Sequence, residues 1–146
     1  MTKVAIKFLR DWQFYLCLLL GPLVWWFLTI LLPVRGDWTV IFDNGLRVLL
    51  VVAVYPILEE LVFRGLILDW LTGWTKKRRY GLISAANLLT SGLFVLAHLI
   101  YQPWFWALSV FFPSLVFGYM KERHHSLIPP IILHSFYNLG FIVFFG

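Results

Sequence analysis

Three charged residues lie within an apolar stretch that is long enough to cross a membrane. Residues 48–68 consist mostly of aliphatic and aromatic side chains, yet they contain Glu59, Glu60 and Arg64. A charge at the centre of a bilayer costs about 2.5–3.5 kcal/mol on insertion scales, so a chain keeps such residues there for structure or for chemistry. Carboxyl groups held in apolar surroundings are typical general bases and acids, which makes hydrolysis a candidate reaction.

Two other apolar segments carry polar side chains at helical spacing. His98 follows Phe94 by four residues and Asn138 follows His134 by four, so each pair shares one helical face. Histidine can orient or activate water, and side-chain N–H groups can stabilise an oxyanion. Each residue also has a structural explanation. His98 can be a hydrogen-bonded packing residue, and His134 and Asn138 can form interhelical hydrogen bonds of about 0.6 kcal/mol each.

Helical geometry separates the roles of the two glutamates. Glu60 and Arg64 are four residues apart and are expected to form an ion pair. Glu59 points about 100° away around the same helix, and Phe63 occupies the matching position four residues later. We therefore take Glu59 as the candidate general base or acid. The alternative is that both glutamates belong to a structural ion network.

The motifs of other intramembrane proteases are missing from the sequence. There is no His-Glu-x-x-His zinc motif and no Gly-x-Ser-Gly motif, the nearest run being Leu89-Thr-Ser-Gly92. Asp37 lies in a polar loop and has no second intramembrane aspartate to form a dyad with. His124 and His125 fall in a charged loop, and no compact ligand spacing occurs, so we expect neither a metal nor another cofactor. The hydrolytic mechanism that remains is attack by a water molecule that a glutamate and a histidine activate.

The composition predicts an integral membrane protein. Apolar residues make up 61% and charged residues 13% of the 146 residues, against about 45–50% and 25% in soluble domains. The only cysteine, Cys17, excludes a disulfide framework. The net charge of +5 is concentrated in loops and is read as a topology signal, so no nucleic-acid partner is expected. The length suits a single domain over residues 1–146.

The predicted fold class is all-α, a polytopic membrane bundle of about five transmembrane helices. Each helix is expected where a continuous apolar segment has the length that crosses a bilayer; these segments are 12–32, 46–70, 82–101, 104–120 and 127–145. Basic residues gather in the loops that face inside if the N-terminus is cytoplasmic; they are Lys3, Lys7, Arg10, Lys76, Lys77, Arg78, Arg79, Lys121 and Arg123.

Prolines mark two places in these predicted helices. Pro56, three residues before Glu59, is expected to free a backbone carbonyl one turn back and to kink or loosen the second helix. Pro129 and Pro130 fit the first turn of the last helix, where proline is tolerated.

Three motifs, in this order, carry a resemblance to a known family. They are Glu59-Glu60-Leu-Val-Phe-Arg64, Phe94-Val-Leu-Ala-His98 and His134-Ser-Phe-Tyr-Asn138. The pattern resembles the CPBP family, the CAAX-protease and bacteriocin-processing membrane proteins also called the Abi family, over roughly residues 52–139.

The resemblance implies a glutamic-type intramembrane endopeptidase. It assigns Glu59 as the base that activates water and His98 as the residue that helps to orient and activate it. His134 and Asn138 would then form the oxyanion hole. Glu60 and Arg64 would support the site structurally. Interpretations of the family as metalloproteases leave a bound metal as an alternative, and the lack of compact ligand spacing in this sequence favours no metal.

The expected function is hydrolysis of a peptide bond in a membrane-anchored peptide or protein, by a multi-pass protein of a prokaryotic cell membrane. The chain is shorter than the larger members of the family, so we expect a bacteriocin leader or a C-terminal sorting segment rather than a prenylated substrate. The alternative is a non-catalytic bacteriocin-immunity or membrane scaffold protein of the same fold. A transporter is disfavoured, because the sequence has no internal repeat.

Overall fold

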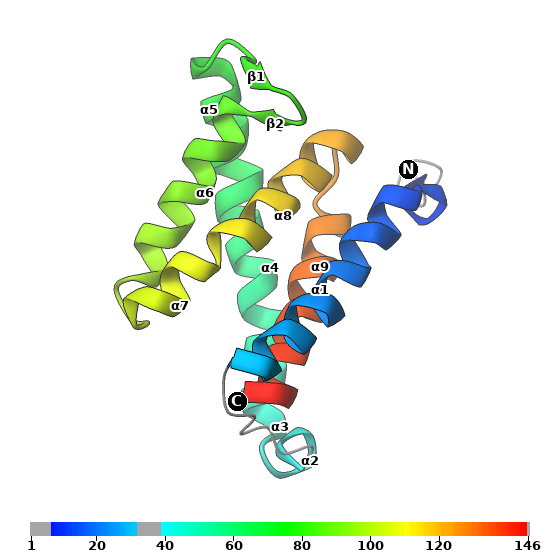
Figure 1. Ribbon diagram of the computed structural model, residues 1–146. Coiled ribbons are helices and arrows are strands. Elements are labelled where there is room, and N and C mark those ends of the chain that lie inside the picture. Colours follow the sequence, from blue (N-terminus) through cyan, green and yellow to red (C-terminus); the bar gives the residue numbers. More distant parts are fainter. Residues whose placement is uncertain (1–6, 32–38, 146) are drawn as a thin grey trace. The chain divides into compact units, whose positions relative to one another are not determined.

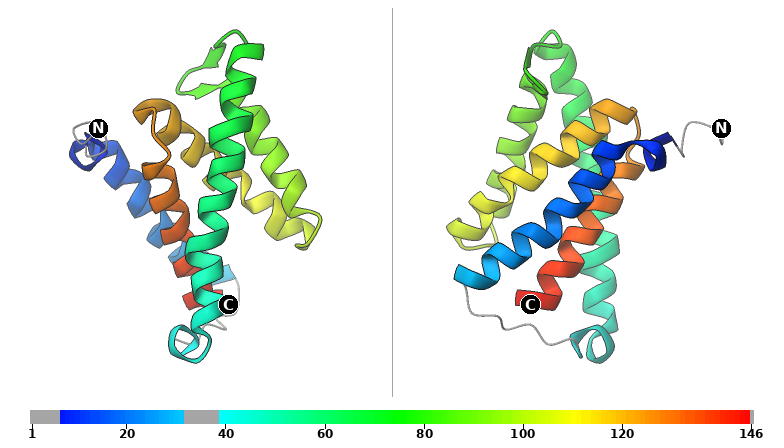
Figure 2. Two further views of the ribbon diagram at one scale, coloured as in Figure 1. Left: turned by 180° about the vertical axis from the view of Figure 1, so that it is seen from behind. Right: turned by 45° about the vertical axis from the view of Figure 1, so that its right-hand side comes forward.

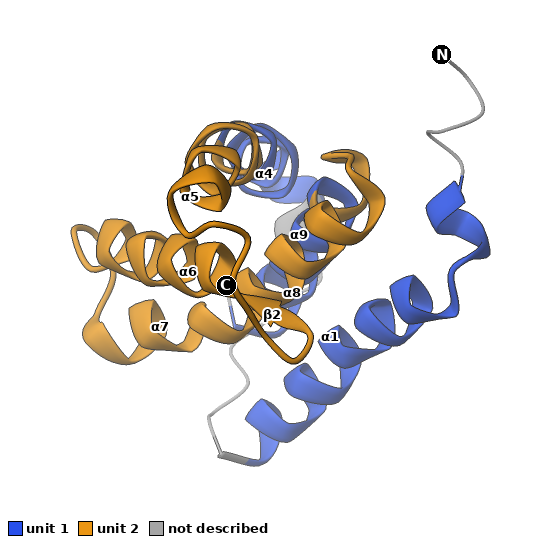
Figure 3. Cartoon of the chain, turned by 90° about the horizontal axis from the view of Figure 1, so that it is seen from above, with its two compact units in different colours: residues 1–58, 131–146 blue, residues 59–130 orange. Residues whose placement is uncertain are grey.

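The computed structural model describes residues 7–31 and 39–145, which form two compact units. Unit 1 comprises residues 1–58 and 131–146, and unit 2 comprises residues 59–130 (Figure 3). Among the described residues nearly all regular structure is helical, as the sequence predicts, and one short hairpin is the exception.

Unit 1 contains two long apolar helices that lie side by side, α1 (Trp12–Leu31) and α9 (Ile128–Phe145) (Figures 1 and 2). Glycine permits their close approach, because a Cβ atom on Gly140 would lie 2.1 Å from the Trp25 ring. The Tyr137 hydroxyl of α9 donates a hydrogen bond to the Cys17 carbonyl of α1. Pro129 and Pro130 occupy the first turn of α9, which confirms the sequence prediction. The short helices η1 (Lys7–Arg10) and α2 (Val40–Asp43) complete the described part of this unit before residue 45.

Residues 45–74 form a continuous helical segment that alternates between α- and π-helical turns. In order, the segment consists of α3 (Gly45–Leu49), η2 (Leu50–Val54), α4 (Tyr55–Glu60), η3 (Leu61–Ile67) and α5 (Leu68–Trp74). The π-helical turn η2 comes just before Pro56, which lacks the N–H that an α-helical turn needs. The expectation that Pro56 loosens this helix is confirmed. Glu59 and Glu60 lie between two π-helical stretches, which occur often at functional sites.

Unit 2 packs the end of this segment against a hairpin and three further helices. The hairpin joins β1 (Arg79–Tyr80) to β2 (Ile83–Ser84) and leads into α6 (Ala85–His98). The helices α7 (Trp104–Ser109) and α8 (Phe111–His124) follow. α6 contacts both α5 and α8 (Figure 1). The buried core of this unit includes Leu68, Leu71 and Ala86, with Ile67 packed against them.

The hairpin corrects the predicted start of the third helix. Tyr80 pairs with Ile83 across a two-residue turn, and Gly81 has a φ of +62°. A glycine at the first central position is the signature of a type II′ hairpin turn, which places residues 82–84 outside any helix. The Ser84 hydroxyl accepts a hydrogen bond from the Asn87 N–H and begins α6 at Ala85. The helix also ends earlier than the predicted residue 101, at His98.

Proline explains a second correction, the break in the predicted helix 104–120. The ring of Pro113 would clash with the carbonyl four residues earlier, at Ser109, and α7 ends at that residue. Pro113 then lies in the first turn of α8, where its missing N–H costs little. α8 continues beyond the predicted boundary to His124.

Two of the helices, α1 and α9, are long and apolar enough to cross a membrane. α6 is apolar but has 14 residues. Large apolar side chains of α1, among them Leu23, Trp26 and Ile30, are exposed. A monomeric soluble protein rarely exposes so large an apolar surface, and such surfaces mark membrane or protein contacts.

Candidate active site

The predicted ion pair between Glu60 and Arg64 is present at the centre of unit 2. Arg64 Nη1 lies 2.9 Å from Glu60 Oε1, and both side chains are fully buried. The pairing follows directly from the i, i+4 spacing on one helical face. Removing water from both charges is expensive, so such a pair needs further hydrogen bonds to be stable.

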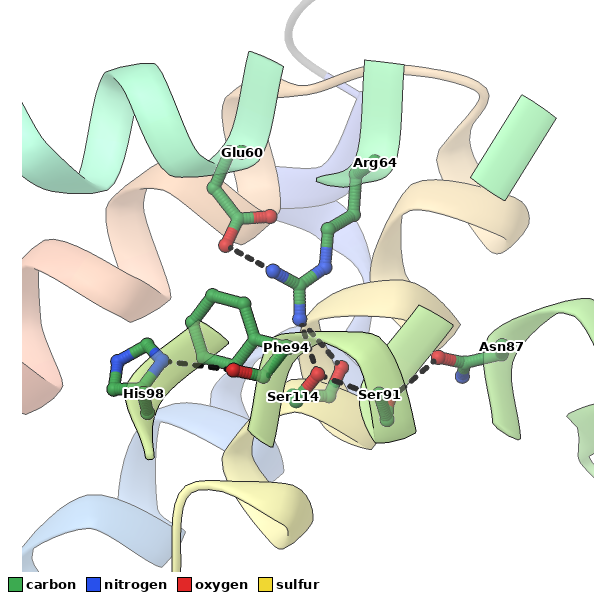
Figure 4. A network of polar contacts seen from close by, with 7 residues as sticks. All are labelled: Glu60, Arg64, Asn87, Ser91, Phe94, His98 and Ser114. Carbon is green, nitrogen blue, oxygen red and sulfur yellow. Dashed lines mark hydrogen bonds and ion pairs between the residues drawn. The ribbon is translucent and has the colours of Figure 1, made fainter. Parts of the chain in front are cut away.

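Those further bonds come from α8. Arg64 Nη2 donates to the carbonyl of Ser114 at 3.0 Å and to its hydroxyl at 2.6 Å. The Ser114 hydroxyl in turn donates to the Ser91 hydroxyl of α6 at 2.9 Å (Figure 4). Arg64 therefore links the helical segment that carries the glutamates to both α6 and α8. Ser91 and Ser114 were not predicted as site residues, because their role depends on contacts between helices.

The network continues along α6 to the hairpin. The Ser91 hydroxyl is 3.4 Å from Asn87 Oδ1, and Asn87 Nδ2 donates to the Leu115 carbonyl at 2.9 Å. At the start of the helix, the Ser84 hydroxyl donates to a Glu122 carboxylate oxygen, and the other oxygen of that carboxylate pairs with Arg79 at 3.4 Å. Hydrogen bonds between buried polar groups of different helices help to fix the register of those helices.

The close approach of α6 and α8 depends on Gly118. A Cβ atom at this position would lie 1.9 Å from Asn87 Oδ1, inside the buried amide. We expect Gly118→Ala to lower the free energy of unfolding by about 1–3 kcal/mol, because the added methyl group overpacks the interface. Thermal melting of the purified protein in detergent measures the loss.

Gly73→Ala is the matched control for this substitution. Its new Cβ atom would meet nothing within 4 Å. Alanine also favours the helix over glycine by up to about 1 kcal/mol, so this variant should melt at or above the wild-type temperature. Equal destabilisation by the two substitutions would contradict the proposed role of Gly118.

Aromatic rings enclose the Arg64 guanidinium. Arg64 Cζ lies 4.7 Å from the centroid of the Phe94 ring and 5.4 Å from that of Phe117. Both rings are buried, and a guanidinium over an aromatic face gains a cation–π interaction that strengthens when water is absent. Phe94, the first residue of the second motif, thus contacts both the ion pair and His98.

The His98 side chain is held in one orientation. Its Nδ1 atom lies 2.9 Å from the Phe94 carbonyl oxygen, and the two rings are 4.4 Å apart. A carbonyl oxygen only accepts, so Nδ1 must carry the proton and donate it. In the neutral ring, Nε2 is then the acceptor nitrogen. This is the arrangement that a histidine needs to orient or deprotonate water.

The ring of Tyr101 packs beside His98. The two rings lie 5.3 Å apart, and the Tyr101 hydroxyl interacts electrostatically with the Glu59 carboxylate. Glu59 is half-buried and also interacts electrostatically with Arg64. Sequence reasoning did not select Tyr101, although its spacing of three residues from His98 was a usable signal.

The other two predicted site residues belong to unit 1. His134 is buried, and Asn138 Nδ2 donates a 2.9 Å hydrogen bond to the Val51 carbonyl. In the π-helical turn η2, Tyr55 bonds to the carbonyl five residues back, at Leu50. Pro56 would be the matching donor to Val51, but it has no N–H. Asn138 therefore satisfies the carbonyl that Pro56 leaves open, and its second amide N–H remains to serve another acceptor.

Residues 7–31 and 39–145 contain no cluster of three or more His, Cys, Asp or Glu side chains that could hold a metal ion. His125 is exposed and adopts a left-handed conformation at the C-cap of α8, as a turn residue.

Comparison with known proteins identifies the family. Residues 41–140 match the family model of type II CAAX prenyl endopeptidase, Rce1-like. The chain belongs to this family, which is part of the CPBP proteins recognised by the three motifs. No curated protein and no solved structure matches the chain significantly.

Proposed function

We propose that the protein is an intramembrane endopeptidase that hydrolyses a peptide bond in a membrane-anchored peptide or protein. The family supports peptide-bond hydrolysis in general terms. The observation that supports the particular mechanism most is the fixed orientation of His98, whose Nδ1 donates to the Phe94 carbonyl and leaves Nε2 as an acceptor. An imidazole acceptor held in one orientation is suited to orient the water molecule that Glu59 would deprotonate.

The proposed reaction has two stages, the addition of water to the substrate carbonyl and the breakdown of the tetrahedral intermediate. Glu59 takes a proton from a water molecule that His98 Nε2 orients, and the resulting hydroxide attacks the substrate carbonyl carbon. Side-chain donors of His134 and Asn138 stabilise the oxyanion of the tetrahedral intermediate. The carbon–nitrogen bond breaks as Glu59 returns the proton to the leaving amine. This mechanism requires His134 and Asn138 to converge with Glu59 and His98 in the folded protein.

The proposed location is a prokaryotic cell membrane, with several passes of the chain and a cytoplasmic N-terminus. α1 and α9 support this location by their length and composition. The exposed apolar side chains of α1 support it as well, because lipid is the environment that such a surface prefers. The substrate is then expected to reach the site from within the bilayer.

Peptidomics of membranes tests the proposed reaction. Cells with the wild-type protein are compared with cells that carry Glu59→Ala, and the control is Asp69→Ala, which removes an exposed carboxylate of the same unit. We expect one or more membrane-anchored peptides to be processed in the wild type and the control, and to accumulate intact with Glu59→Ala. If no peptide depends on Glu59, the non-catalytic immunity or scaffold function takes its place.

Asn138 should have two separable effects. We expect Asn138→Ala to slow cleavage by about 10²–10³, because one oxyanion donor is lost. It should also lower the free energy of unfolding by about 1–3 kcal/mol, because the Val51 carbonyl loses its partner. Steady-state cleavage and thermal melting measure the two effects.

A second substitution separates the two effects. Pro56→Ala restores a backbone N–H that can reach the open carbonyl, so the double variant Pro56→Ala/Asn138→Ala should regain stability but remain slow. Recovery of the cleavage rate in the double variant would show that Asn138 acts only through Val51.

A further inference from the structure

Within unit 2, α5 and α6 leave an apolar groove on the outside of the molecule. The groove has a volume of about 410 Å³, which falls in the range of about 300–1,000 Å³ found for small-molecule sites. Trp70 and Trp74 of α5 form one wall, and Gly92 and leucines of α6 form the other. A lining of this kind offers no polar partner and accepts a hydrocarbon chain.

One end of the groove adjoins a basic turn. Trp74 ends α5, and Lys76 and Lys77 follow in the turn that leads to the hairpin. Backbone hydrogen bonds from Lys76 to Gly73 and from Lys77 to Thr72, both of 3.2 Å, hold this turn against the end of the helix. The two lysine side chains are exposed. Two positively charged residues thus follow closely after Trp74, which lines the groove.

The backbone of this turn adopts a conformation that is unusual for lysine. Lys76 and Lys77 have φ angles of +51° and +58°, in the left-handed region that disfavours L-residues other than asparagine and aspartate. Helices commonly end with glycine in such a position, because glycine adopts it without strain. Backbone strain that persists is a sign of function when a second observation supports it. Here that observation is the adjoining groove.

The basic run continues with Arg78 and Arg79, and both of these side chains interact with other residues of the protein. The Arg78 guanidinium lies 5.3 Å from the Tyr80 ring centroid, and Arg79 pairs with Glu122. Lys76 and Lys77 make no ion pair among the residues that the structure describes. Their ammonium groups are available to a ligand.

We infer that an anionic phospholipid binds unit 2, with an acyl chain in the groove between α5 and α6 and its phosphate group on Lys76 and Lys77. Tryptophans at the head-group level and basic side chains just outside the bilayer are the chemistry that recognises such lipids. The inference rests on the proposed membrane location and not on the proposed peptidase reaction. It gives the basic run a binding role in addition to its role in topology.

Native mass spectrometry of the delipidated protein in mild detergent tests this site. The protein is titrated with dioleoyl phosphatidylglycerol or with dioleoyl phosphatidylcholine. We expect the anionic lipid to bind more tightly, by about fivefold for each lysine that contacts it, or about 25-fold for the pair. Equal affinity for the two lipids would overturn the inference.

The charge arm of the experiment uses Lys76→Asn/Lys77→Asn. Asparagine tolerates the left-handed conformation, so this double variant removes both charges without adding strain to the turn. It should lose the preference for the anionic lipid. The control is Lys7→Gln/Arg10→Gln, which removes two exposed charges from unit 1 and should keep the preference. Equal loss in both variants would show a general effect of net charge and no site.

The groove arm uses Gly92→Leu. A Cβ atom at Gly92 would meet nothing within 4 Å, so a leucine side chain has room to fill the groove without disturbing the fold. The variant should bind both lipids less tightly, whereas Gly73→Leu, on an exposed glycine outside the lining, should bind as the wild type does. Unchanged binding by Gly92→Leu would place the acyl chain elsewhere and overturn the inference.

The lipid-binding inference and the proposed peptidase reaction can be refuted independently of each other. Lipid affinity is measured without substrate, and Glu59→Gln should bind phosphatidylglycerol as the wild type does. Loss of proteolysis as a function would leave the lipid result intact. Recovery of the protein from the soluble fraction of cells would instead refute the membrane location on which the lipid site depends.

Discussion

Arg64→Ala should lower the free energy of unfolding by about 3–5 kcal/mol, because it leaves the buried Glu60 carboxylate without its counter-charge. The arginine is fully buried and bonds to both Glu60 and Ser114, so its removal also leaves the Ser114 carbonyl and hydroxyl without their donor. Denaturant titration in mild detergent, together with the yield of monodisperse protein, measures the effect.

Two further variants make this result specific. Asp69→Ala breaks an ion pair with Lys121 in which the aspartate side chain is 58% exposed, and exposed pairs contribute only about 0–1 kcal/mol. Replacing both partners, as in Glu60→Gln/Arg64→Met, should be less damaging than Arg64→Ala alone, because no charge is then left buried. A well-folded but inactive Arg64→Ala would place the arginine in the chemistry.

Glu59→Gln should abolish cleavage while leaving the melting temperature unchanged. Glutamine keeps the size and much of the hydrogen bonding of glutamate, but it cannot take a proton from water. General-base catalysis contributes about 10²–10⁴ to a rate, so the remaining activity should fall by at least that factor. The measurement uses the peptide identified by peptidomics, reconstituted with the enzyme in liposomes.

A charge control and a chelator complete the experiment. Asp69→Asn removes an exposed carboxylate of unit 2 and should cleave at the wild-type rate. A chelator should also leave the rate unchanged if Glu59 and His98 activate the water without a metal. Reversible loss of activity with a chelator, restored by zinc, would contradict the metal-free mechanism and assign His98 and His134 as ligands.

Long apolar segments made most of the helices predictable. α1 and α9 follow the predicted ranges within a residue or two, because a continuous apolar run has no competing local structure. The break at Pro113 and the hairpin at residues 79–84 were missed, although each had a local signal in proline or glycine. Both signals lie within or beside segments rich in apolar residues, and the prediction followed this apolar composition instead of the proline and the glycine.

The candidate site was predictable only where it depends on one helix. Spacing along the chain was enough to pair Glu60 with Arg64 and to place Phe94 beside His98. The bonds from Arg64 to Ser114 and from Ser114 to Ser91 join three helical segments. Their formation depends on how the helices are rotated against each other, which no single segment determines.

The length of α6 has a consequence for the surrounding lipid. A helix of 14 residues extends about 21 Å, whereas the hydrocarbon core of a bilayer is about 30 Å thick. In the proposed membrane location, this hydrophobic mismatch is relieved by local thinning of the bilayer, at a modest cost for each ångström. Thinning beside α6 shortens the distance from bulk water to His98, which is the last residue of that helix. In the proposed membrane location, the short helix would therefore give the proposed peptidase site a route to the water that it consumes.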